Sequence, residues 1–195
     1  MSACVGLVEV KEVYVDLGDR AVGRKRLKGK GETTQLIAAV AAEVLEPKGI
    51  GRICLRRIES VSQEHVQPFV EESIEPPAQV HTDGSWAYRF LQGKGYVQQR
   101  AAVHLGGKRV ASLPVVTRVA ALLKRWLLGT HHGAVQPAQL DHSLEEFAFR
   151  FNRRTSRSRG LLFHRLLEQS VRHDPITYRD VVHSSRNRQV ALDWS

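Results

Sequence analysis

The sequence predicts an α/β fold in which helices flank a mixed sheet and the C-terminal part of the chain is helical. Three observations support this prediction. The first part of the chain has three stretches with strand patterning, the middle alternates between helix and strand patterns, and the last third shows helical patterns. The chain has 195 residues, of which 42% are hydrophobic, so it can bury a core of ordinary size.

Three strands are predicted in the first part of the chain. Residues 5–17 alternate between valine and polar side chains, which is typical of a strand. Residues 33–44 are apolar and compatible with a strand or a helix, and their Thr-Thr start and short length favour a strand. Residues 51–58 alternate again, so we expect a hairpin with the preceding strand through residues 47–49. The segment 18–31 is rich in Gly, Lys and Arg, which predicts a basic loop.

Helix and strand patterns alternate in the middle of the chain. Residues 62–74 predict a helix, because Ser62 is a candidate N-cap and acidic residues lie near both ends. Pro76 and Pro77 are expected to end that helix, because proline cannot continue it. The shorter elements that follow are a strand over residues 78–82, a short helix over 86–91, a strand over 96–103 and a loop over 105–110.

The last third of the chain predicts three helices and a tail. Pro114 is a favourable first residue for a helix that we expect to run to about Leu128 and to end at Gly129. Its apolar side chains recur at helical spacing and predict one buried face. The remaining expectations are helices over residues 137–151 and 160–171, one domain over residues 1–173, and a polar tail over residues 174–195.

Charge and cysteine content limit the classes of function. Lys and Arg total 29 against 20 acidic residues, with a net charge of +9 and a pI of about 10.0. A polyanionic partner is therefore expected, and nucleic acid is the commonest; the alternative is a soluble protein with a basic surface. Cys4 and Cys54 are too few for a disulfide scaffold or a Cys-rich zinc ribbon, and they fit a reducing cytoplasm. The chain has no apolar run long enough to span a membrane and no secretory signal at its start.

Four stretches of the chain carry a resemblance to a known family. They keep their order along the chain, and the last two are long and unusual in composition. The chain resembles the DDE transposases of the insertion-sequence family numbered fifteen-ninety-five. The stretches are VEVKEVYV at residues 8–15, VHTDGSWAY at residues 80–88, LLKRWLLGTHHGAV at residues 122–135 and EEFAFRFNRRTSRSRGLLFHRLL at residues 145–167.

The resemblance implies an RNase H-like fold and metal-dependent DNA chemistry. Members of this family cut and join DNA strands in transposition, with acidic side chains that hold two divalent cations, Mg²⁺ or Mn²⁺. Carboxylate oxygens suit these hard cations. DNA is the implied partner, a homo-oligomer is a further expectation, and the implied location is the prokaryotic cytoplasm near the nucleoid.

Asp83 matches the second acid of the family, and the resemblance makes it the predicted catalytic carboxylate and metal ligand. It follows a short predicted strand, and in α/β sheets ligands gather beyond the carboxyl ends of strands. The alternative is that Asp83 and Gly84 form a turn and nothing more, which this dipeptide also favours. The matching stretch VHTDG favours the catalytic role.

The first acidic position is altered. The family reads Val-Glu-Val-Asp-Glu in its first strand, whereas this chain has Lys11 in place of the aspartate. A protonated ammonium group cannot bind a cation, and at about 4 Å it repels a divalent ion by roughly 8 kcal/mol with an effective dielectric constant near 20. Glu12 cannot easily replace the lost carboxylate, because successive side chains of a strand face opposite ways. An ion pair of Lys11 with Glu9 or with Asp83 is a hypothesis.

Thr117 occupies the third acidic position of the family, seven residues before Lys124. Seven residues make two helical turns, so both side chains share one face of the predicted helix. Thr117 offers a hydroxyl group but no charge. Lys124 and Arg125 match the family's basic pair, so Lys124 is a predicted catalytic residue that positions a phosphate and Arg125 a predicted DNA contact. The alternative for both is a solvated helix face.

A short segment after the aromatic-rich end of a predicted helix contains four arginines. Guanidinium groups suit bidentate phosphate contacts, which position DNA without reading its sequence. We therefore predict DNA binding by these arginines, with a disordered basic turn as the alternative; the loop over residues 18–31 has the same two interpretations. The four are Arg153, Arg154, Arg157 and Arg159.

Two main functions stay open at the level of sequence. The first is a transposase that acts by metal-dependent DNA cleavage and strand transfer but is catalytically impaired. The second is a non-catalytic DNA-binding remnant that interferes with active relatives, and Lys11 favours it. A third and weaker interpretation is an interaction protein that keeps the scaffold alone. Because the family usually has an N-terminal zinc ribbon and this chain has too few cysteines for one, we expect a truncated copy or a misassigned start.

Overall fold

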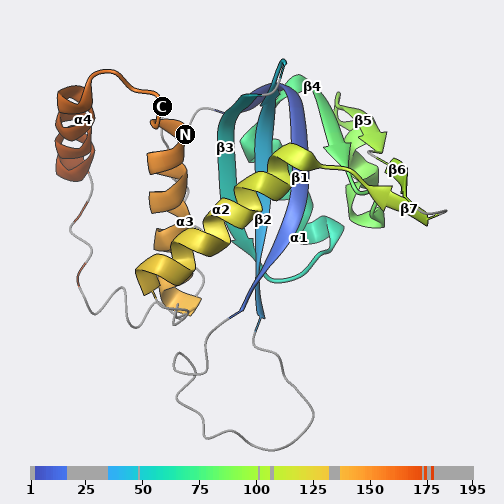
Figure 1. The fold of residues 1–195 in the computed structure, drawn as a ribbon, viewed down its shortest axis with the longest axis horizontal. Coiled ribbons are helices and arrows are strands. Elements are labelled where there is room, and N and C mark those ends of the chain that lie inside the picture. Colours follow the sequence, from blue (N-terminus) through green and yellow to red (C-terminus); the bar gives the residue numbers. More distant parts are fainter. Residues whose placement is uncertain are drawn as a thin grey trace, which may run out of the picture.

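The computed structural model describes residues 3–16, 35–47, 49–100, 102–105, 108–131 and 137–172, together with residues 174 and 177. The basic loop predicted over residues 18–31 lies outside the described residues, as does most of the predicted tail. The described chain folds around a five-stranded sheet with helices on both faces (Figure 1).

The sheet consists of β1 (Cys4–Asp16), β2 (Gln35–Leu45), β3 (Gly49–Ile58), β4 (Ile74–Thr82) and β5 (Val97–Arg100), in the order β3-β2-β1-β4-β5. β2 is antiparallel to both β1 and β3, whereas β4 runs parallel to β1 and β5. A three-stranded antiparallel meander followed by parallel strands is the arrangement of an RNase H-like domain. The predicted fold class is therefore confirmed.

The other elements are α1 (Gln63–Ser73), the 3₁₀ helix η1 (Trp86–Gly93), β6 (Ala102–Leu105), β7 (Lys108–Ala111), α2 (Pro114–His131), α3 (Pro137–Asn152) and α4 (Arg159–Arg172). α2 crosses one face of the sheet, and α3 packs on the same face beside β3 (Figure 1). α1 and η1 cover the opposite face. In the part of the chain that the structure describes, no helix is both long and apolar enough to cross a membrane.

Two clusters of buried side chains fill the two faces of the sheet. Because side chains alternate along a strand, Val8 and Val10 of β1 face α1 and η1, while Val13 and Val15 face α2 and α3. The centre of β2, residues 38–42, is buried on both faces. This double burial explains why its sequence shows a continuous apolar run rather than alternation. The choice of a strand over a helix for this stretch is confirmed.

Most predicted elements are confirmed, with ends that differ by one or two residues. The helix that was expected to end at Gly129 instead continues to His131. His131 contacts α3 through Ser143, with 3.2 Å between Nε2 and Oγ, and its ring packs edge-on against Trp126. These contacts stabilise the last turn and outweigh the modest helical cost of one glycine.

Two predictions about strands are wrong. Pro76 and Pro77 do not precede the strand but lie inside β4, which begins at Ile74. The register between β1 and β4 shifts at these prolines. They therefore occupy a bulge, where no hydrogen bond from their nitrogen atoms is needed.

The strand predicted over residues 96–103 and the loop predicted over residues 105–110 are also corrected. β5 ends at Arg100, and the chain then forms a separate hairpin of β6 and β7. Each of these three strands has four residues, which is too short to display a clear alternation in the sequence.

Candidate active site

β1 carries the altered first position in the middle of the sheet. β1 pairs in parallel with β4, and Glu9 lies opposite His81 in that register. Continuing the register by two residues places Lys11 level with Asp83, which directly follows β4. The sheet therefore brings position 11 of β1 close to the carboxyl end of β4, where Asp83 begins the turn.

Asp83 lies in a tight turn between β4 and η1. Its Oδ1 accepts a hydrogen bond from the backbone N–H of Ser85 at 2.9 Å, and Thr82 Oγ1 accepts one from the N–H of Gly84 at 3.2 Å. Gly84 has a φ of 86°, a conformation that glycine adopts without steric cost. Asp83 is exposed, so the turn fixes one carboxylate oxygen and leaves the other open to solvent.

Glu9 is buried and binds the start of α2. Its Oε2 accepts a hydrogen bond from the N–H of Val116 at 2.8 Å, and the N–H of Val115 also stabilises the carboxylate. The first N–H groups of a helix have no partner within the helix, and here a strand residue caps them. Burial raises the pKa of Glu9, although these two hydrogen bonds and the nearby His81 lower it in part. Glu9 therefore fixes α2 to the face of β1 that Lys11 shares.

Glu12 is buried on the opposite face of β1 and binds η1. Its Oε1 accepts a hydrogen bond from the Tyr88 hydroxyl at 2.5 Å. Burial raises the pKa of Glu12; the bond from Tyr88 lowers it, and the negative charge of Asp83 raises it. Burial, and then the charge of Glu12, raises the pKa of Tyr88. Because η1 follows the turn of Asp83, this bond holds that turn against β1.

Lys11 is half-buried and forms neither of the ion pairs that the sequence made conceivable. Among the ion pairs of the described residues, none within 4.0 Å includes Lys11, so the hypothesis of a pair with Glu9 or Asp83 is wrong. Glu9 is bound by backbone groups of α2, and Asp83 by the N–H of Ser85. Lys11 therefore has no ion-pair partner among the described residues.

α2 carries the third position and the basic pair. One face of this helix is buried against the sheet, and Thr117, Lys124 and Arg125 lie outside that face, where they are exposed. Thr117 lies in the turn that Glu9 anchors to β1. Lys124 lies two turns further along, about 10 Å away along the helix axis. The altered third position is thus held near the altered first position, while the basic pair points to solvent.

The donor groups around Asp83 do not fit the divalent cations of the family. Such cations need several oxygen ligands, mostly carboxylates, held close together. Glu9 and Glu12 are both bound by protein donors, and Thr117 offers a neutral hydroxyl. No group of three or more potential metal ligands occurs among the described residues. Asp83 is exposed, and position 11, which the resemblance aligns with the first acid, is a lysine.

Arg154 lies beside β3, at the opposite edge of the sheet from β4 and Asp83. Its guanidinium donates hydrogen bonds to the carbonyl oxygens of Gly51, at 3.3 Å, and of Ile50. It also stacks over the ring of Phe151, 4.0 Å from the centroid. DNA binding by Arg154 stays a prediction, and the guanidinium already has a structural role.

The other predicted arginines also follow α3. Arg153 stacks over Phe149, 3.8 Å from the ring centroid. Burial lowers the pKa of Arg153, and repulsion by Arg165 lowers it further, so positive charge is concentrated here. Arg157 is exposed, and Arg159 begins α4 with a side chain outside the described ones. The structure therefore separates this basic group from Lys124 and Arg125 and from Asp83.

Asn152 has a structural role that sequence patterns do not show. Its Oδ1 accepts a hydrogen bond from the N–H of Ile53 at 2.8 Å, and its Nδ2 donates one to the carbonyl oxygen of Ile53 at 2.9 Å. The amide thereby imitates a neighbouring strand at the edge of β3. Sequence reasoning also gave no role to Tyr88. Both residues lie in the stretches that carry the family resemblance, which was the available signal.

Comparison with known proteins places the chain in a family. The fold is similar to the crystal structure of the catalytic core domain of BIV integrase, with a TM-score of 0.49 and 13% sequence identity, over 85% of this chain and 96% of that chain. No curated protein matches the chain. The sequence matches the ISXO2-like transposase domain over residues 4–152. Because this match covers most of its length, the chain belongs to the ISXO2-like transposase domain family.

Proposed function

We propose that this chain functions in DNA transposition as a DNA-binding transposase-family protein whose catalytic site is impaired. Family membership supports the transposase-type function, and the excess of basic residues supports DNA as the partner. The proposed location is the prokaryotic cytoplasm, close to the nucleoid. The single observation that carries the impairment is Lys11, level with Asp83 at the carboxyl end of β4.

The physical reason for the impairment is charge. Replacing an aspartate by a lysine changes the charge beside Asp83 by two units, from attraction to repulsion of a cation. Asp83 alone cannot offset that repulsion, because Mg²⁺ prefers several oxygen ligands and loses its water reluctantly. Glu9 and Glu12 cannot substitute without breaking the bonds that hold α2 and η1. We therefore propose that this chain binds Mg²⁺ or Mn²⁺ weakly or not at all.

Two separate basic groups support DNA binding. Lys124 and Arg125 are exposed on α2, on the side of the sheet that carries Thr117. Arg153 and Arg157 follow α3, which packs against β3, and β3 is three strand spacings from β4, or about 14 Å. Contacts from both groups would reach different phosphates of one DNA segment and would fix its position without reading its sequence.

The second candidate function is a non-catalytic remnant that interferes with active relatives through mixed oligomers. Lys11 favours it, because a chain without metal binding could still bind DNA and partners. α4 supports self-association, since Phe163, Leu167 and Val171, which lie four residues apart on one face of the helix, are 65%, 49% and 86% exposed. Apolar side chains clustered on an exposed helix are typical of an interaction surface.

Calorimetric titration of Mn²⁺ tests the impairment. We expect no measurable binding by the unaltered chain and clear binding by Lys11→Asp, which restores a carboxylate level with Asp83. Adding Asp83→Ala to Lys11→Asp should abolish that binding. A matched control is Arg89→Asp, which makes the same charge change at an exposed residue of η1 and should not create a site.

Two outcomes separate the alternatives. If the unaltered chain binds Mn²⁺ and Asp83→Ala removes the binding, the proposed impairment is wrong and strand-transfer assays become the next step. If Lys11→Asp also fails to bind, Lys11 is not the sole defect, and Lys11→Asp combined with Thr117→Glu should then bind.

A further inference from the structure

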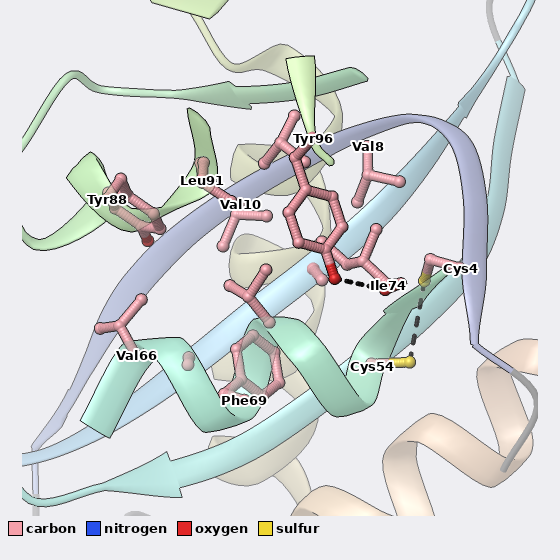
Figure 2. Close-up of a cluster of buried hydrophobic side chains, with 14 of the residues drawn as sticks. Cys4, Val8, Val10, Cys54, Val66, Phe69, Ile74, Tyr88, Leu91 and Tyr96 are labelled. Carbon is pink, nitrogen blue, oxygen red and sulfur yellow. Dashed lines mark hydrogen bonds between the residues drawn. The ribbon is translucent and has the colours of Figure 1, made fainter. Parts of the chain in front are cut away.

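Cys4 and Cys54 lie in contact in the core between the sheet and α1 (Figure 2). Cys4 is the first residue of β1 and Cys54 lies in β3, and their Sγ atoms are 3.7 Å apart. Each thiol is also near a carbonyl oxygen, that of Arg52 for Cys4 and that of Ser73 for Cys54. A disulfide needs an S–S distance of about 2.0 Å. A small movement of one side chain would therefore join them.

The start of β1 is the part of the sheet that can open most easily around this pair. The register between β1 and β4 is irregular between Cys4 and Gly6, and Gly6 has a φ of 72°. The N–H of Val5 donates to the side chain of Glu43 in β2, at 3.0 Å from Oε1, instead of to a backbone carbonyl. Few ladder bonds therefore hold Cys4, and local opening there needs less free energy than unfolding of the sheet. Cys54 is itself 6% exposed, enough contact with solvent for a very small reagent.

The two thiols differ in their tendency to ionise. The hydrogen bond with Cys4 is the main cause that lowers the pKa of Cys54, and the positive charge of Arg52 lowers it further. The hydrogen bond to Cys54, together with burial, raises the pKa of Cys4. A thiolate is the form that reacts with peroxides. The pair thus has an attacking sulfur at Cys54 and a resolving thiol at Cys4.

We propose that Cys4 and Cys54 form an oxidation site at which hydrogen peroxide produces a reversible disulfide. First, the Cys54 sulfur bonds to one peroxide oxygen, the O–O bond breaks, and the released hydroxide takes a proton and becomes water. Next, the Cys4 sulfur attacks the sulfur of the Cys54 sulfenic acid, the S–O bond breaks, and the hydroxide leaves with the Cys4 proton as a second water. The two thiols lose two electrons in total, and the peroxide gains them.

The disulfide would connect the first residue of the central strand to an edge strand. The two cysteines are 50 positions apart in the sequence, so the link constrains a long loop of the unfolded chain. The expected rise in melting temperature is on the order of 10 °C. This inference does not depend on DNA binding, because the oxidation can be followed on the chain alone, without DNA.

Mass spectrometry of the intact chain after treatment with hydrogen peroxide tests the proposal. We expect a loss of about 2 Da, disappearance of both free thiols, and reversal by dithiothreitol. Among oxidised chains, the share that carries the disulfide instead of further added oxygen should be higher in the folded chain than in urea, because folding places the sulfurs in contact. Retention of both thiols, or addition of oxygen without the loss of 2 Da, would overturn the proposal. An equal share of disulfide in the folded and unfolded chains would overturn it as well.

Single substitutions test the order of the two steps. Cys4→Ser leaves Cys54 without its resolving thiol, so a dimedone-type probe should trap a sulfenic acid there. Cys54→Ser leaves the fully buried Cys4, which should be trapped at least several-fold more slowly. The reverse order would contradict Cys54 as the attacking sulfur. The comparison of oxidised and reduced unaltered chain needs neither variant, and an unchanged melting temperature would contradict the proposed link.

Discussion

Glu9 and Glu12 bind different elements through opposite faces of the same strand. Glu9 holds the N-terminus of α2, and Glu12 holds η1 through the Tyr88 hydroxyl. α2 carries Thr117, the third candidate position, and η1 follows the turn of Asp83. Both carboxylates are therefore anchors of the site rather than spare metal ligands. This arrangement explains how the geometry can persist with Lys11 at the position that the family resemblance aligns with the first acid.

Glu9→Gln should change how stability depends on pH. Burial raises the pKa of Glu9 above its ordinary value of 4.5, so the folded chain holds this proton more tightly than the unfolded chain. Such a group contributes stability below pH 4.5, and the contribution is lost as pH rises through the raised pKa. Glutamine keeps an acceptor oxygen for Val116 but cannot titrate. Between pH 4.5 and neutral pH, the free energy of unfolding should therefore fall less for Glu9→Gln than for the unaltered chain.

Urea unfolding at a series of pH values provides the measurement. Glu146→Gln is a suitable control, because that carboxylate is exposed and paired with Arg150. If the free energy of unfolding depends on pH in the same way for the unaltered chain and for Glu9→Gln across this range, Glu9 does not titrate as described.

Tyr88→Phe should destabilise the chain by about 1.5–3 kcal/mol, because it leaves the buried carboxylate of Glu12 without its donor. The cost should shrink at low pH, where Glu12 is protonated. Tyr14→Phe serves as the control: Tyr14 is 47% exposed, so its change should stay within about 0.5 kcal/mol. An equal decrease of the free energy of unfolding in urea for the two variants would contradict the anchoring role of the Glu12–Tyr88 bond.

At the residue scale, the sequence could predict which residues occupy the candidate site, but few of the contacts that these residues make. The family resemblance located Asp83, Lys11 and Thr117, and the alternation of β1 correctly placed Glu12 on the face opposite Lys11. The role of Glu9 could not be predicted, because its partner is 107 positions away and no local pattern records such a contact. The hypothesis of a Lys11–Glu9 pair is wrong for the same reason, because the Glu9 carboxylate accepts hydrogen bonds from backbone N–H groups of α2, which is distant in the sequence.

At the element scale, the edge of β3 depends on one side chain. The amide of Asn152 satisfies both backbone groups of Ile53. We expect Asn152→Ala to lower the free energy of unfolding by about 1–3 kcal/mol, because two hydrogen bonds are removed and neither backbone group finds a new partner. Hydrogen exchange at the Ile53 amide should accelerate in the same variant.

Arg150→Ala is the matched control for Asn152→Ala. Arg150 lies on the same helix, is 68% exposed and pairs with Glu146, so its loss should cost less than about 0.5 kcal/mol. Unchanged exchange at Ile53 in Asn152→Ala would mean that the amide does not protect this edge.

Periodicity correctly predicted the elements whose buried and exposed faces follow from their own sequence pattern. Amphipathic spacing was enough for α2, and alternation was enough for β1 and β3. The predictions are wrong where contacts with a neighbouring element determine the local structure. Pro76 and Pro77 fit into β4 because the register of β1 allows a bulge there, and α2 passes Gly129 because α3 stabilises its last turn.

At the scale of the whole molecule, the net charge of +9 should make DNA binding strongly dependent on salt. Replacing both Arg153 and Arg157 by alanine should weaken binding similarly for all sequences. It should also reduce the slope of log affinity against log salt by about 1.8, or 0.9 for each phosphate that is no longer neutralised. Fluorescence anisotropy at several salt concentrations measures both effects.

Arg56→Ala provides the comparison, since Glu72 already pairs with this arginine. It should leave the slope almost unchanged. An equal reduction by Arg56→Ala would show that total charge, rather than the arginine group after α3, determines binding.

The order of strands and helices was sufficient to predict the fold class, because a three-stranded meander followed by alternating elements can be packed into few compact topologies. It could not show that the arginine group lies across the sheet from Asp83. That separation follows from packing of α3 against β3, which no sequence pattern encodes.

The closed edge of β3 has a further consequence for solubility. An uncovered edge strand is a template onto which the strand of another molecule can add, and repeated addition leads to aggregation. Asn152 and Arg154 occupy the outward backbone groups of Ile50, Gly51 and Ile53, so an incoming strand finds no free partner there. Asn152→Ala should therefore aggregate at lower protein concentration than the unaltered chain, even at temperatures where both remain folded.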